Sequence, residues 1–308
     1  MQIIDNVCTN ETHFPNVVLT IGSFDGIHLG HQRLLQQLIA HARTCSGTAT
    51  LMTLRPHPRQ FFSPMHAPNI LTSDTKKEAL LADAGLDVLF VLPFDAAVAH
   101  LDRKQFLEEI VLMRCGAKHL IVGHDFNFGK DAAGDFEYLC KVAPDYDLQI
   151  EQVPALIHHG ERVSSTLVRE AILQGDLVNA ESFLGRQYSI LGCVSQGRGI
   201  GAKIGFPTAN IDPHHNAMPA HGVYIAEALI GERRVPAAVN IGIAPTLQHD
   251  HPVLEAHLLD FDENIVGEPI EIIFHKRIRP EKKFESIDAL MVAIDNDVNQ
   301  VRQYFIDQ

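Results

Sequence analysis

The chain has 308 residues, of which 46% are hydrophobic and 20% charged, a globular composition that excludes a disordered chain. Its 25 basic and 38 acidic residues give a formal net charge of −13. A chain this acidic lacks the basic surface of a nucleic-acid or anionic-membrane binder, so we expect neither partner. Any phosphate must therefore bind in small local sites. At about 150 residues per domain, the length predicts two domains.

Five cysteines are scattered along the chain without any Cys-x-x-Cys spacing: Cys8, Cys45, Cys115, Cys140 and Cys193. Their odd number and spacing predict neither a disulfide framework nor a thiolate zinc site. The first residues carry no basic segment ahead of an apolar core, so they do not resemble a signal peptide. No uninterrupted apolar run reaches the roughly 20 residues of a membrane span. We therefore expect a cytoplasmic protein.

Before residue 184, short apolar strands alternate with helical patterns. A first strand is predicted at 17–21, and Leu34, Leu35, Leu38 and Ile39 mark the helix that follows it. The remaining elements are strands at 48–54, 87–92, 118–122 and 147–153, with helices at 75–84, 102–114 and 135–141. This alternation predicts an α/β domain with a parallel sheet covered on both faces. Its ligands should bind beyond the carboxyl ends of the strands.

The pattern changes near residues 184–188, and strand then follows strand. These strands are predicted at 188–196, 222–230, 234–241, 253–261 and 269–276. Consecutive strands without helices predict an antiparallel sheet or small β-barrel. A last helix is predicted at 286–305, with an inner face made of Ile287, Leu290, Ile294, Val298, Val301 and Phe305. We therefore predict two domains, 1–186 and 187–308.

The densest chemical string joins the first strand to the first helix and runs Gly22-Ser23-Phe24-Asp25-Gly26-Ile27-His28-Leu29-Gly30-His31. Its glycines let the backbone approach a ligand closely, and the helix start offers unpaired N–H groups to an anion. His28 and His31 are three residues apart, so they share a face of the first helical turn. Two imidazoles there can donate hydrogen bonds to a phosphoryl group as its charge develops. The string therefore predicts a phosphate site.

The histidine pair alone has no diagnostic value. Among 308 residues with 18 histidines, chance gives about one His-x-x-His pair. The prediction depends on the whole string and on its position between a strand and a helix.

The string resembles the signature of the adenylyltransferase superfamily, and in its full form that of bacterial bifunctional riboflavin kinase/FMN adenylyltransferases. Three further segments resemble motifs of this family. Pro56-His57-Pro58 with Phe62 resembles a flavin-holding segment, and Asp125-Phe126-Asn127-Phe128 lies in a loop that covers flavin and nucleotide in the family. Ser164-Ser165-Thr166 with Arg169 resembles the second nucleotide motif, with Arg169 in a catalytic role. The resemblance implies a Rossmann-like nucleotidyltransferase domain.

Each of these segments also has a purely structural interpretation. Ser164 to Arg169 opens a predicted helix, so its hydroxyls could serve only as an N-terminal cap. Phe126 and Phe128 alternate with Asp125 and Asn127, so rings and polar groups face opposite ways in an extended segment. Rings of this kind in loops often serve packing alone. The segment around His57 could equally be an exposed loop.

A second phosphate site is predicted in the carboxyl-terminal half. The glycine-rich stretch 197–205 ends at Gly205 and includes Gly201 and Lys203. Backbone N–H groups of such a loop can wrap a polyphosphate, although the Walker A ending is missing. Thr208 and Asn210 are two apart, so in an extended chain their oxygens point the same way and suit Mg²⁺. Pro207-Thr208-Ala209-Asn210 resembles the riboflavin kinase signature, which implies an ATP and Mg²⁺ site in a kinase-like β-barrel.

Glu255 is predicted as the general base of this second site. By alternation it shares a strand face with Val253, His257, Leu259 and Phe261. A carboxylate there can take a proton from a substrate hydroxyl, and the family carries its kinase base at this position. Arg279 resembles a residue near the flavin or nucleotide entrance, although a surface charge cluster is an alternative.

Some positions differ from the common family pattern. Ala202 and Ala244 stand where the family often has arginine, and Arg198 or Lys203 is the alternative cation for the first of them. Asn127 and Asp131 stand where many members carry basic residues.

The resemblance implies a bifunctional enzyme that uses Mg²⁺ and ATP. It phosphorylates riboflavin to FMN and then transfers AMP to FMN, which gives FAD and pyrophosphate. Two alternatives are a single-activity FAD synthetase with a decayed kinase domain and a non-catalytic flavin-binding regulator; the intact His28, His31, Thr208, Asn210 and Glu255 argue against both. The expected partners are riboflavin, FMN and ATP, and the expected state is a monomer or weak homo-oligomer.

Overall fold

The computed structural model describes residues 1–197, 200–213, 216–245 and 250–307. These residues form two compact units. The first contains Met1–Pro68 and Asp74–Ser164, and the second contains Asn69–Ser73 and Ser165–Gln308. The units therefore divide between residues 164 and 165, ahead of the domain boundary at 186/187 that we predicted from the sequence.

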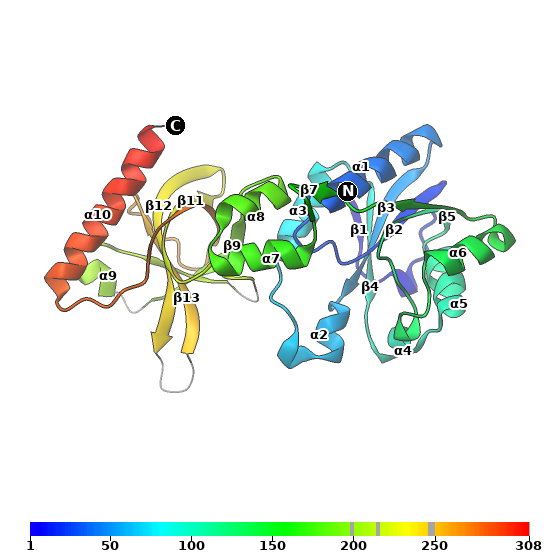
Figure 1. Cartoon of the computed structure of the whole chain (residues 1–308), viewed down its shortest axis with the longest axis horizontal. Helices are drawn as coiled ribbons and strands as arrows, with labels where there is room; N and C mark the ends of the chain where they lie inside the picture. Colours follow the sequence, from blue (N-terminus) through cyan, green and yellow to red (C-terminus); the bar gives the residue numbers. More distant parts are fainter. Residues whose placement is uncertain (198–199, 214–215, 246–249, 308) are drawn as a thin grey trace. The chain divides into compact units, whose positions relative to one another are not determined.

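The first unit is built on a parallel sheet of six strands in the order β1-β4-β3-β2-β5-β6 (Figure 1). These strands are β1 (Gln2–Ile4), β2 (Val17–Ile21), β3 (Thr48–Arg55), β4 (Val88–Pro93), β5 (Ala117–Gly123) and β6 (Gln149–Val153). The short pair β7 (Ile157–His158) and β8 (Glu161–Arg162) forms a separate hairpin. The predicted parallel sheet is confirmed. Strands β1, β7 and β8 were not predicted, because two or three residues are too few to show an alternating pattern.

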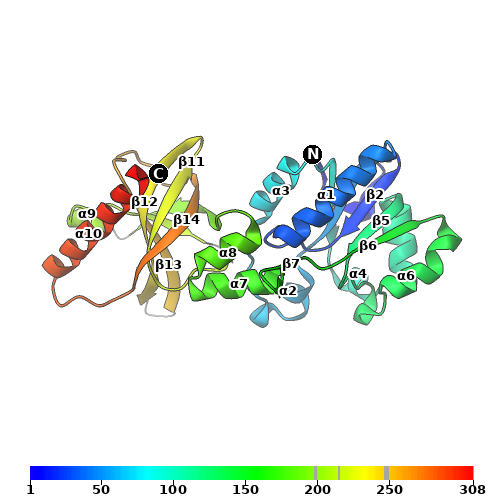
Figure 2. The same cartoon turned by 45° about the horizontal axis from the view of Figure 1, so that its top comes forward.

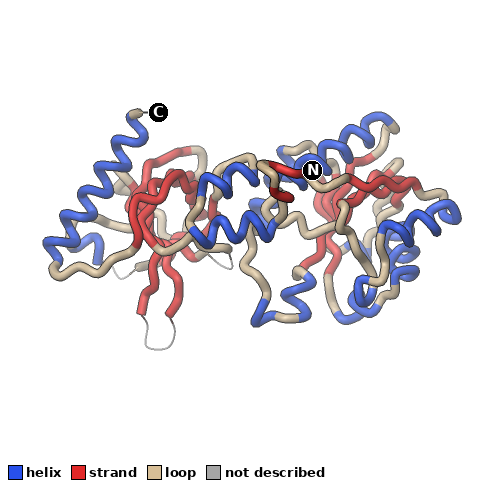
Figure 3. The backbone as a smooth tube through the Cα atoms, in the orientation of Figure 1, coloured by secondary structure: helices blue, strands red, loops and turns tan. Residues whose placement is uncertain are grey.

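Helices cover both faces of this sheet (Figure 3). On one face, Leu34, Leu35 and Leu38 of α1 and Leu81 of α3 pack on strand residues such as Val18. On the other face, Phe106 to Val111 and Leu139 pack on a second set of strand residues. The helices are α1 (Leu29–Thr44), α2 (Pro58–Phe62), α3 (Asp74–Asp83), α4 (Ala96–His100), α5 (Arg103–Gln105), the π-helical turns Phe106–Arg114 and α6 (Phe136–Val142).

The second unit is a closed antiparallel barrel in the order β10-β13-β12-β11-β14-β9 (Figure 2). The predicted barrel is confirmed. Its strands are β9 (Ser189–Ser195), β10 (Ala209–Asp212), β11 (Gly222–Ile230), β12 (Arg233–Pro245), β13 (Asp250–Leu258) and β14 (Pro269–Pro280). Strand β13 ends at Leu258, and Asp260 turns the chain with a φ of 54°, so the predicted strand stops short of Phe261. Leu259 still packs with Ile225 and with Ala238, the partner of His257, so it lies on the predicted side.

Four helices accompany the barrel: α7 (Ser165–Gln174), α8 (Leu177–Leu184), α9 (Ile200–Lys203) and α10 (Ile287–Ile306). Val298 and Val301 of α10 pack on Ile225 and Ala238, which lie on the outer wall of the barrel. The predicted inner face of α10 is wrong at Ile287. This first helical residue lies outside the packed cluster and is 64% exposed. Within the described residues, no helix is both long enough and apolar enough to cross a membrane.

Candidate active sites

The first predicted phosphate site is a tight turn between β2 and α1. Phe24 and Ile27 take positive φ angles of 48° and 40°, and Gly26 takes 84°. Such left-handed angles are uncommon outside glycine, so the turn holds local backbone strain of the kind found at functional sites. Asp25 is 8% exposed, and Gly22 lies against the Phe24 ring, which a Cβ at Gly22 would approach to 3.1 Å.

His28 is the N-terminal cap of α1. Its Nδ1 accepts a hydrogen bond from the backbone N–H of His31 at 3.3 Å. In a neutral ring the proton therefore sits on Nε2, the position from which the ring can donate to a phosphate. Gly30 packs tightly between the two histidines, since a Cβ there would lie 3.1 Å from the His28 ring and would press on it.

The rings of His28 and His31 stack with their centroids 3.7 Å apart, which confirms the predicted shared face. The Phe24 ring lies 4.6 Å from His31 on another side. Burial, then His28 and then Lys77 lower the pKa of His31 well below its ordinary value, so this ring is neutral at pH 7. Its Nδ1 is buried without a hydrogen-bond partner among the described residues, which leaves a polar atom for a ligand to satisfy.

Lys77 of α3 is a candidate site residue that the sequence patterns missed. Its charge acts on His31, its side chain is only 11% exposed, and Asp74 lies 3.4 Å from its ammonium nitrogen. It comes from a helix 46 positions beyond His31, with no motif around it. A cation held beside the neutral His31 ring suits an anionic ligand.

The predicted flavin segment after β3 forms a small aromatic group. His57 caps α2, because its Nδ1 accepts from the backbone N–H of Arg59 at 3.1 Å, with Pro56 before it and Pro58 after it. Phe62 is 65% exposed, and its ring meets those of Phe61 and Phe94 edge-on at 5.2 and 5.7 Å. Phe61 and Phe94 are further candidates, and Phe94 follows the end of the neighbouring strand β4.

The loop after β5 separates its rings from its polar groups as predicted. Asp125 and Asn127 are exposed, whereas Phe126 is partly buried and Phe128 is 7% exposed. Phe128 stacks on Phe126 and contacts Phe106 and Tyr138 in the core. This packing gives Phe128 a core role and leaves the exposed Asp125 and Asn127 on the solvent side of the loop.

The second nucleotide motif divides at the unit boundary, with Ser164 in the first unit and Ser165 in the second. Ser165 and Thr166 begin α7, and Val168 is buried one turn into the helix. The guanidinium of Arg169 donates to the Asn69 carbonyl at 2.8 Å and to the Ser165 carbonyl at 3.3 Å. Arg169 is thus held over the first turn of α7, where a polyphosphate would meet N–H groups and a cation together.

In the barrel, strand register places the residues of the second predicted site in one row. Asn210 of β10 pairs with Glu255 of β13, and Glu255 pairs with Asn240 of β12. Directly paired residues of antiparallel strands project from the same face, so these three side chains are neighbours. The alternating residues Ile211, Leu254 and Val239 are 0–3% exposed and fill the barrel, so the row lies on its outer wall, the face that α10 covers in part.

Two glycines of the glycine-rich stretch lie close to Asn210 and Thr208. A Cβ at Gly197 would lie 2.0 Å from the Asn210 amide, and one at Gly201 would lie 2.3 Å from the Phe206 carbonyl and 3.4 Å from Thr208 Oγ1. Glycine is therefore required where the loop crosses Thr208 and Asn210. Gly205 ends the loop with a φ of 90°. Lys203 belongs to α9, but its side chain, like all of Arg198, falls outside the described residues, as does the side chain of Ala244.

Two contacts attach this loop and α10 to the row. His257 Nδ1 lies 2.8 Å from the Pro207 carbonyl and fixes the start of β10 against β13. At the other end, Arg279 holds Asp297 of α10 with distances of 2.7 to 3.1 Å, and Asp297 is 3% exposed. Arg279 lies across β11 from Asn240, through Val223. Asn240 and Asp297 are residues that the sequence patterns did not single out, because only strand register and helix packing bring them here. His257 was predicted by alternation as a neighbour of Glu255 on its strand face.

The oxygens of Thr208, Asn210 and Glu255 fit a magnesium ion. They are hard ligands, and Mg²⁺ takes one or two protein groups together with phosphates and water. Gly197 beside Asn210 and Gly201 beside Thr208 leave space there that a Cβ at either position would fill.

Comparison with known proteins matches both halves of the chain. The FAD synthetase family matches residues 10–167, and the riboflavin kinase family matches residues 184–305. The bifunctional riboflavin kinase/FMN adenylyltransferase of Escherichia coli is 38% identical over 94% of this chain and 92% of its own length. The bifunctional riboflavin kinase/FMN adenylyltransferase of Haemophilus influenzae is 35% identical over 99% of this chain and 99% of its own length.

A solved structure described as a macrolide-efflux protein from Streptococcus pneumoniae superposes with a TM-score of 0.87. It is 29% identical and covers 97% of this chain and 98% of its own. Two family matches in chain order and the relatives of nearly equal length agree with the two phosphate sites. This chain belongs to the family of bifunctional riboflavin kinases/FMN adenylyltransferases.

Proposed function

We propose that the enzyme adenylylates FMN at a site on the turn between β2 and α1. We propose that it phosphorylates riboflavin at a second site on the outer wall of the barrel. The family carries out both reactions, and this chain has both domains. The observation that carries the assignment of the second site is the register Asn210–Glu255, which sets a metal ligand beside a candidate base.

In the first site, an oxygen of the FMN phosphate attacks the α-phosphorus of ATP, and pyrophosphate leaves. His28 and the neutral His31 donate N–H groups to the phosphate oxygens as charge builds, and Lys77 supplies a nearby positive charge. The backbone of Gly22, Ser23, Phe24, Asp25 and Gly30 lets ATP approach closely. Ser164, Ser165, Thr166 and Arg169 bind its outer phosphates.

FMN is held by the segment after β3 and the loop after β5. Phe62, with Phe61 and Phe94 beside it, offers an exposed aromatic surface to the flat flavin ring. Pro56, His57 and Pro58 shape the segment, while Asp125, Phe126, Asn127 and Phe128 form the opposite loop.

In the second site, the glycine loop with Gly201, Lys203 and Gly205 wraps the phosphates of ATP. Glu255 orients the riboflavin 5′-hydroxyl and accepts its proton as the new O–P bond forms. Mg²⁺ held by Thr208 and Asn210 would neutralise charge on the phosphates. Arg279, fixed by Asp297, lies at the flavin side of the row.

The division of labour follows the domains 1–186 and 187–308, and the enzyme works in the cytoplasm as a monomer or weak homo-oligomer. The FAD synthetase match ends at residue 167, within α7, and the riboflavin kinase match begins at residue 184, the last residue of α8.

Magnesium dependence tests the barrel assignment. In Asn210→Ala, the Mg²⁺ concentration that gives half-maximal FMN formation should rise at least about tenfold, the scale of a weakened metal site. The value for FAD formation from supplied FMN should stay unchanged. Equal shifts in both reactions, or in neither, would contradict a metal site at Asn210.

A further inference from the structure

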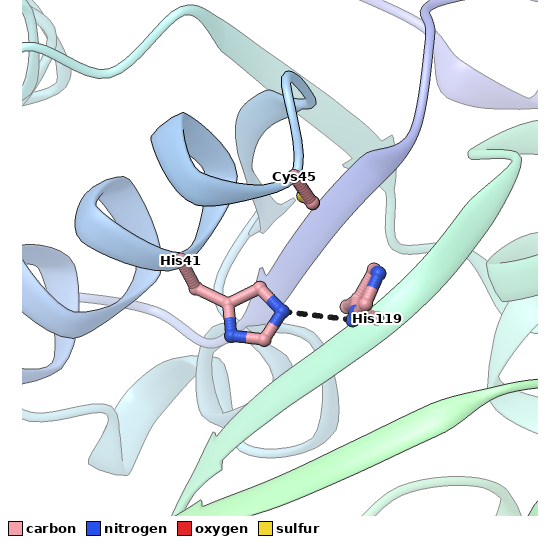
Figure 4. Close-up of side chains that lie close together, drawn as sticks. All are labelled: His41, Cys45 and His119. Atoms are coloured by element: carbon pink, nitrogen blue, oxygen red, sulfur yellow. Dashed lines mark hydrogen bonds between the residues drawn. The ribbon is translucent and has the colours of Figure 1, made fainter.

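A second polar cluster of the α/β unit lies at the end of α1, away from the predicted phosphate site at the start of that helix. It consists of His41, Cys45 and His119, from the end of α1 and from β5 (Figure 4). His41 is ten residues beyond His31, which is about 15 Å along a helix. His119 lies near the amino end of β5, whereas Gly123 ends that strand. The cluster therefore lies toward the edge of the sheet opposite its ligand-binding edge.

The three side chains converge. His41 Nε2 and His119 Nδ1 are 2.9 Å apart, and one ligand atom from each residue lies within 4.8 Å of the others. His41 and Cys45 are four residues apart, so they share a face of the helix end. In Figure 4 the two imidazole rings point toward one another, with the Cys45 side chain near them.

Local packing fixes the cysteine. The Asn16 amide donates to the Cys45 carbonyl at 3.1 Å, and the Cys45 thiol lies 3.6 Å from the Ala42 carbonyl. Gly47 is required beside it, because a Cβ there would lie 3.0 Å from the sulfur and 2.2 Å from the Asn16 carbonyl oxygen. Cys45 is therefore held near the imidazoles rather than free to turn away.

We propose that His41, Cys45 and His119 form a binding site for Zn²⁺. Two imidazole nitrogens and a thiolate are the ligand types that zinc prefers, and three protein ligands leave a fourth position for water. Around one tetrahedral zinc ion the ligand atoms are about 3.3 to 3.6 Å apart, from Zn–N and Zn–S bonds of about 2.0 and 2.3 Å. The 2.9 Å imidazole pair needs to open slightly, and the sulfur needs to move in by no more than about 1 Å.

Binding of zinc is balanced by protons. The short contact between His41 and His119 places one N–H and one lone pair between the rings. The donating ring moves that proton to its other nitrogen, so that both facing nitrogens offer lone pairs. The Cys45 thiol loses its proton to solvent, and one proton is released for each zinc ion bound. The bound ion would then link the end of α1 to β5.

Cobalt titration of the full-length, metal-stripped protein tests the site. Co²⁺ that replaces zinc beside a thiolate gives a sulfur-to-cobalt charge-transfer band, so one equivalent should produce this band and added Zn²⁺ should abolish it. Cys45→Ser should lose the band. In competition with a chromophoric chelator, His41→Ala and His119→Ala should bind Zn²⁺ at least 10- to 100-fold more weakly. A loss of this size already follows when only a hydrogen-bond partner of a metal ligand is removed.

Matched controls come from the same protein. Cys140→Ser removes an exposed thiol outside the cluster, and His158→Ala removes one ring of an adjacent histidine pair, so both variants should bind cobalt as the parent does. All variants should still make FAD, which shows that they are folded. The absence of a charge-transfer band in the parent protein would overturn the proposal, as would equal loss of the band in Cys45→Ser and Cys140→Ser.

Discussion

The α/β unit has its proposed phosphate-binding groups on one continuous turn, residues 22–31, whereas the barrel collects the residues of its proposed site from separate strands. In the first site, the strand end, the strained turn and the helix cap follow one another in the chain. In the second, Asn210, Glu255 and Asn240 meet only through strand pairing. The contrast teaches that a phosphate site can be specified by local backbone geometry or by the register of a closed sheet.

This difference predicts how each site fails when it is altered. A change in the turn should affect only the groups of that turn. A change in the barrel row can disturb the pairing of its strands, the glycine-rich stretch or α10. The row is built by that pairing, and the stretch and α10 are attached beside it. The variants below separate these routes.

Replacing the candidate base of the barrel row should have the largest effect. Glu255→Gln keeps the shape of the side chain but cannot accept a proton. FMN formation from riboflavin should fall by roughly 10²- to 10⁴-fold, the span of general base catalysis, with little change in riboflavin affinity. Near-normal kinase turnover in rapid-quench assays would remove Glu255 from the mechanism.

Removing an imidazole from the turn should affect the other reaction. His31→Ala should lower FAD formation from FMN by roughly 10²- to 10³-fold, the scale of a lost oxyanion donor. Riboflavin phosphorylation should hardly change. If both activities fall equally, the substitution has damaged folding rather than the site.

The Arg279–Asp297 pair should matter for the stability of the barrel. Arg279→Gln leaves Asp297, which is 3% exposed, without its guanidinium. We expect the free energy of unfolding to fall by about 3 kcal/mol. This is the lower end of the range for breaking a buried ion pair, because the Arg279 side chain is 23% exposed and water weakens the interaction.

A surface pair in the same unit provides the control. Arg302 pairs with Asp260, but these side chains are 46% and 70% exposed. Arg302→Gln should therefore cost about 0–1 kcal/mol in urea unfolding. Equal costs for the two variants would contradict a structural role for the Arg279–Asp297 pair.

The buried His31 ring should make a small contribution to pH dependence. Because its pKa in the folded chain is lowered well below that of the unfolded chain, the unfolded state binds more protons below about pH 6.5. Stability should therefore fall as pH decreases from about 6.5 toward the folded pKa, by at most about 1.4 kcal/mol per pH unit. His31→Asn should flatten this dependence in thermal unfolding between pH 7 and 5, and an unchanged slope would contradict it.

The fold and the first site were predictable because their signals are local. Apolar strands alternating with helices predicted the parallel sheet, and the turn residues predicted the stacked His28 and His31. Lys77 was not predictable, since it comes from α3 and no spacing links it to the turn. The same holds for Asn240 and Asp297, which reach the barrel row through pairing and helix packing.

Two errors show where periodicity fails. The alternation of side chains predicted that the strand of Glu255 continues to Phe261. The left-handed backbone conformation of Asp260 ends the strand before that residue. Helical spacing placed Ile287 on the inner face of α10, but the first turn of that helix lies beyond the packed cluster. Similarly, the absence of Cys-x-x-Cys concealed the cluster around Cys45, because its third member comes from β5.

Two separate active sites in one chain are the central claim, and the most direct measurement follows FMN and FAD separately from riboflavin and ATP. The parent protein should form FMN and then FAD. His31→Ala should accumulate FMN, whereas Glu255→Gln should form neither product from riboflavin yet convert supplied FMN to FAD at the normal rate. Loss of both activities in either folded variant would contradict two independent sites.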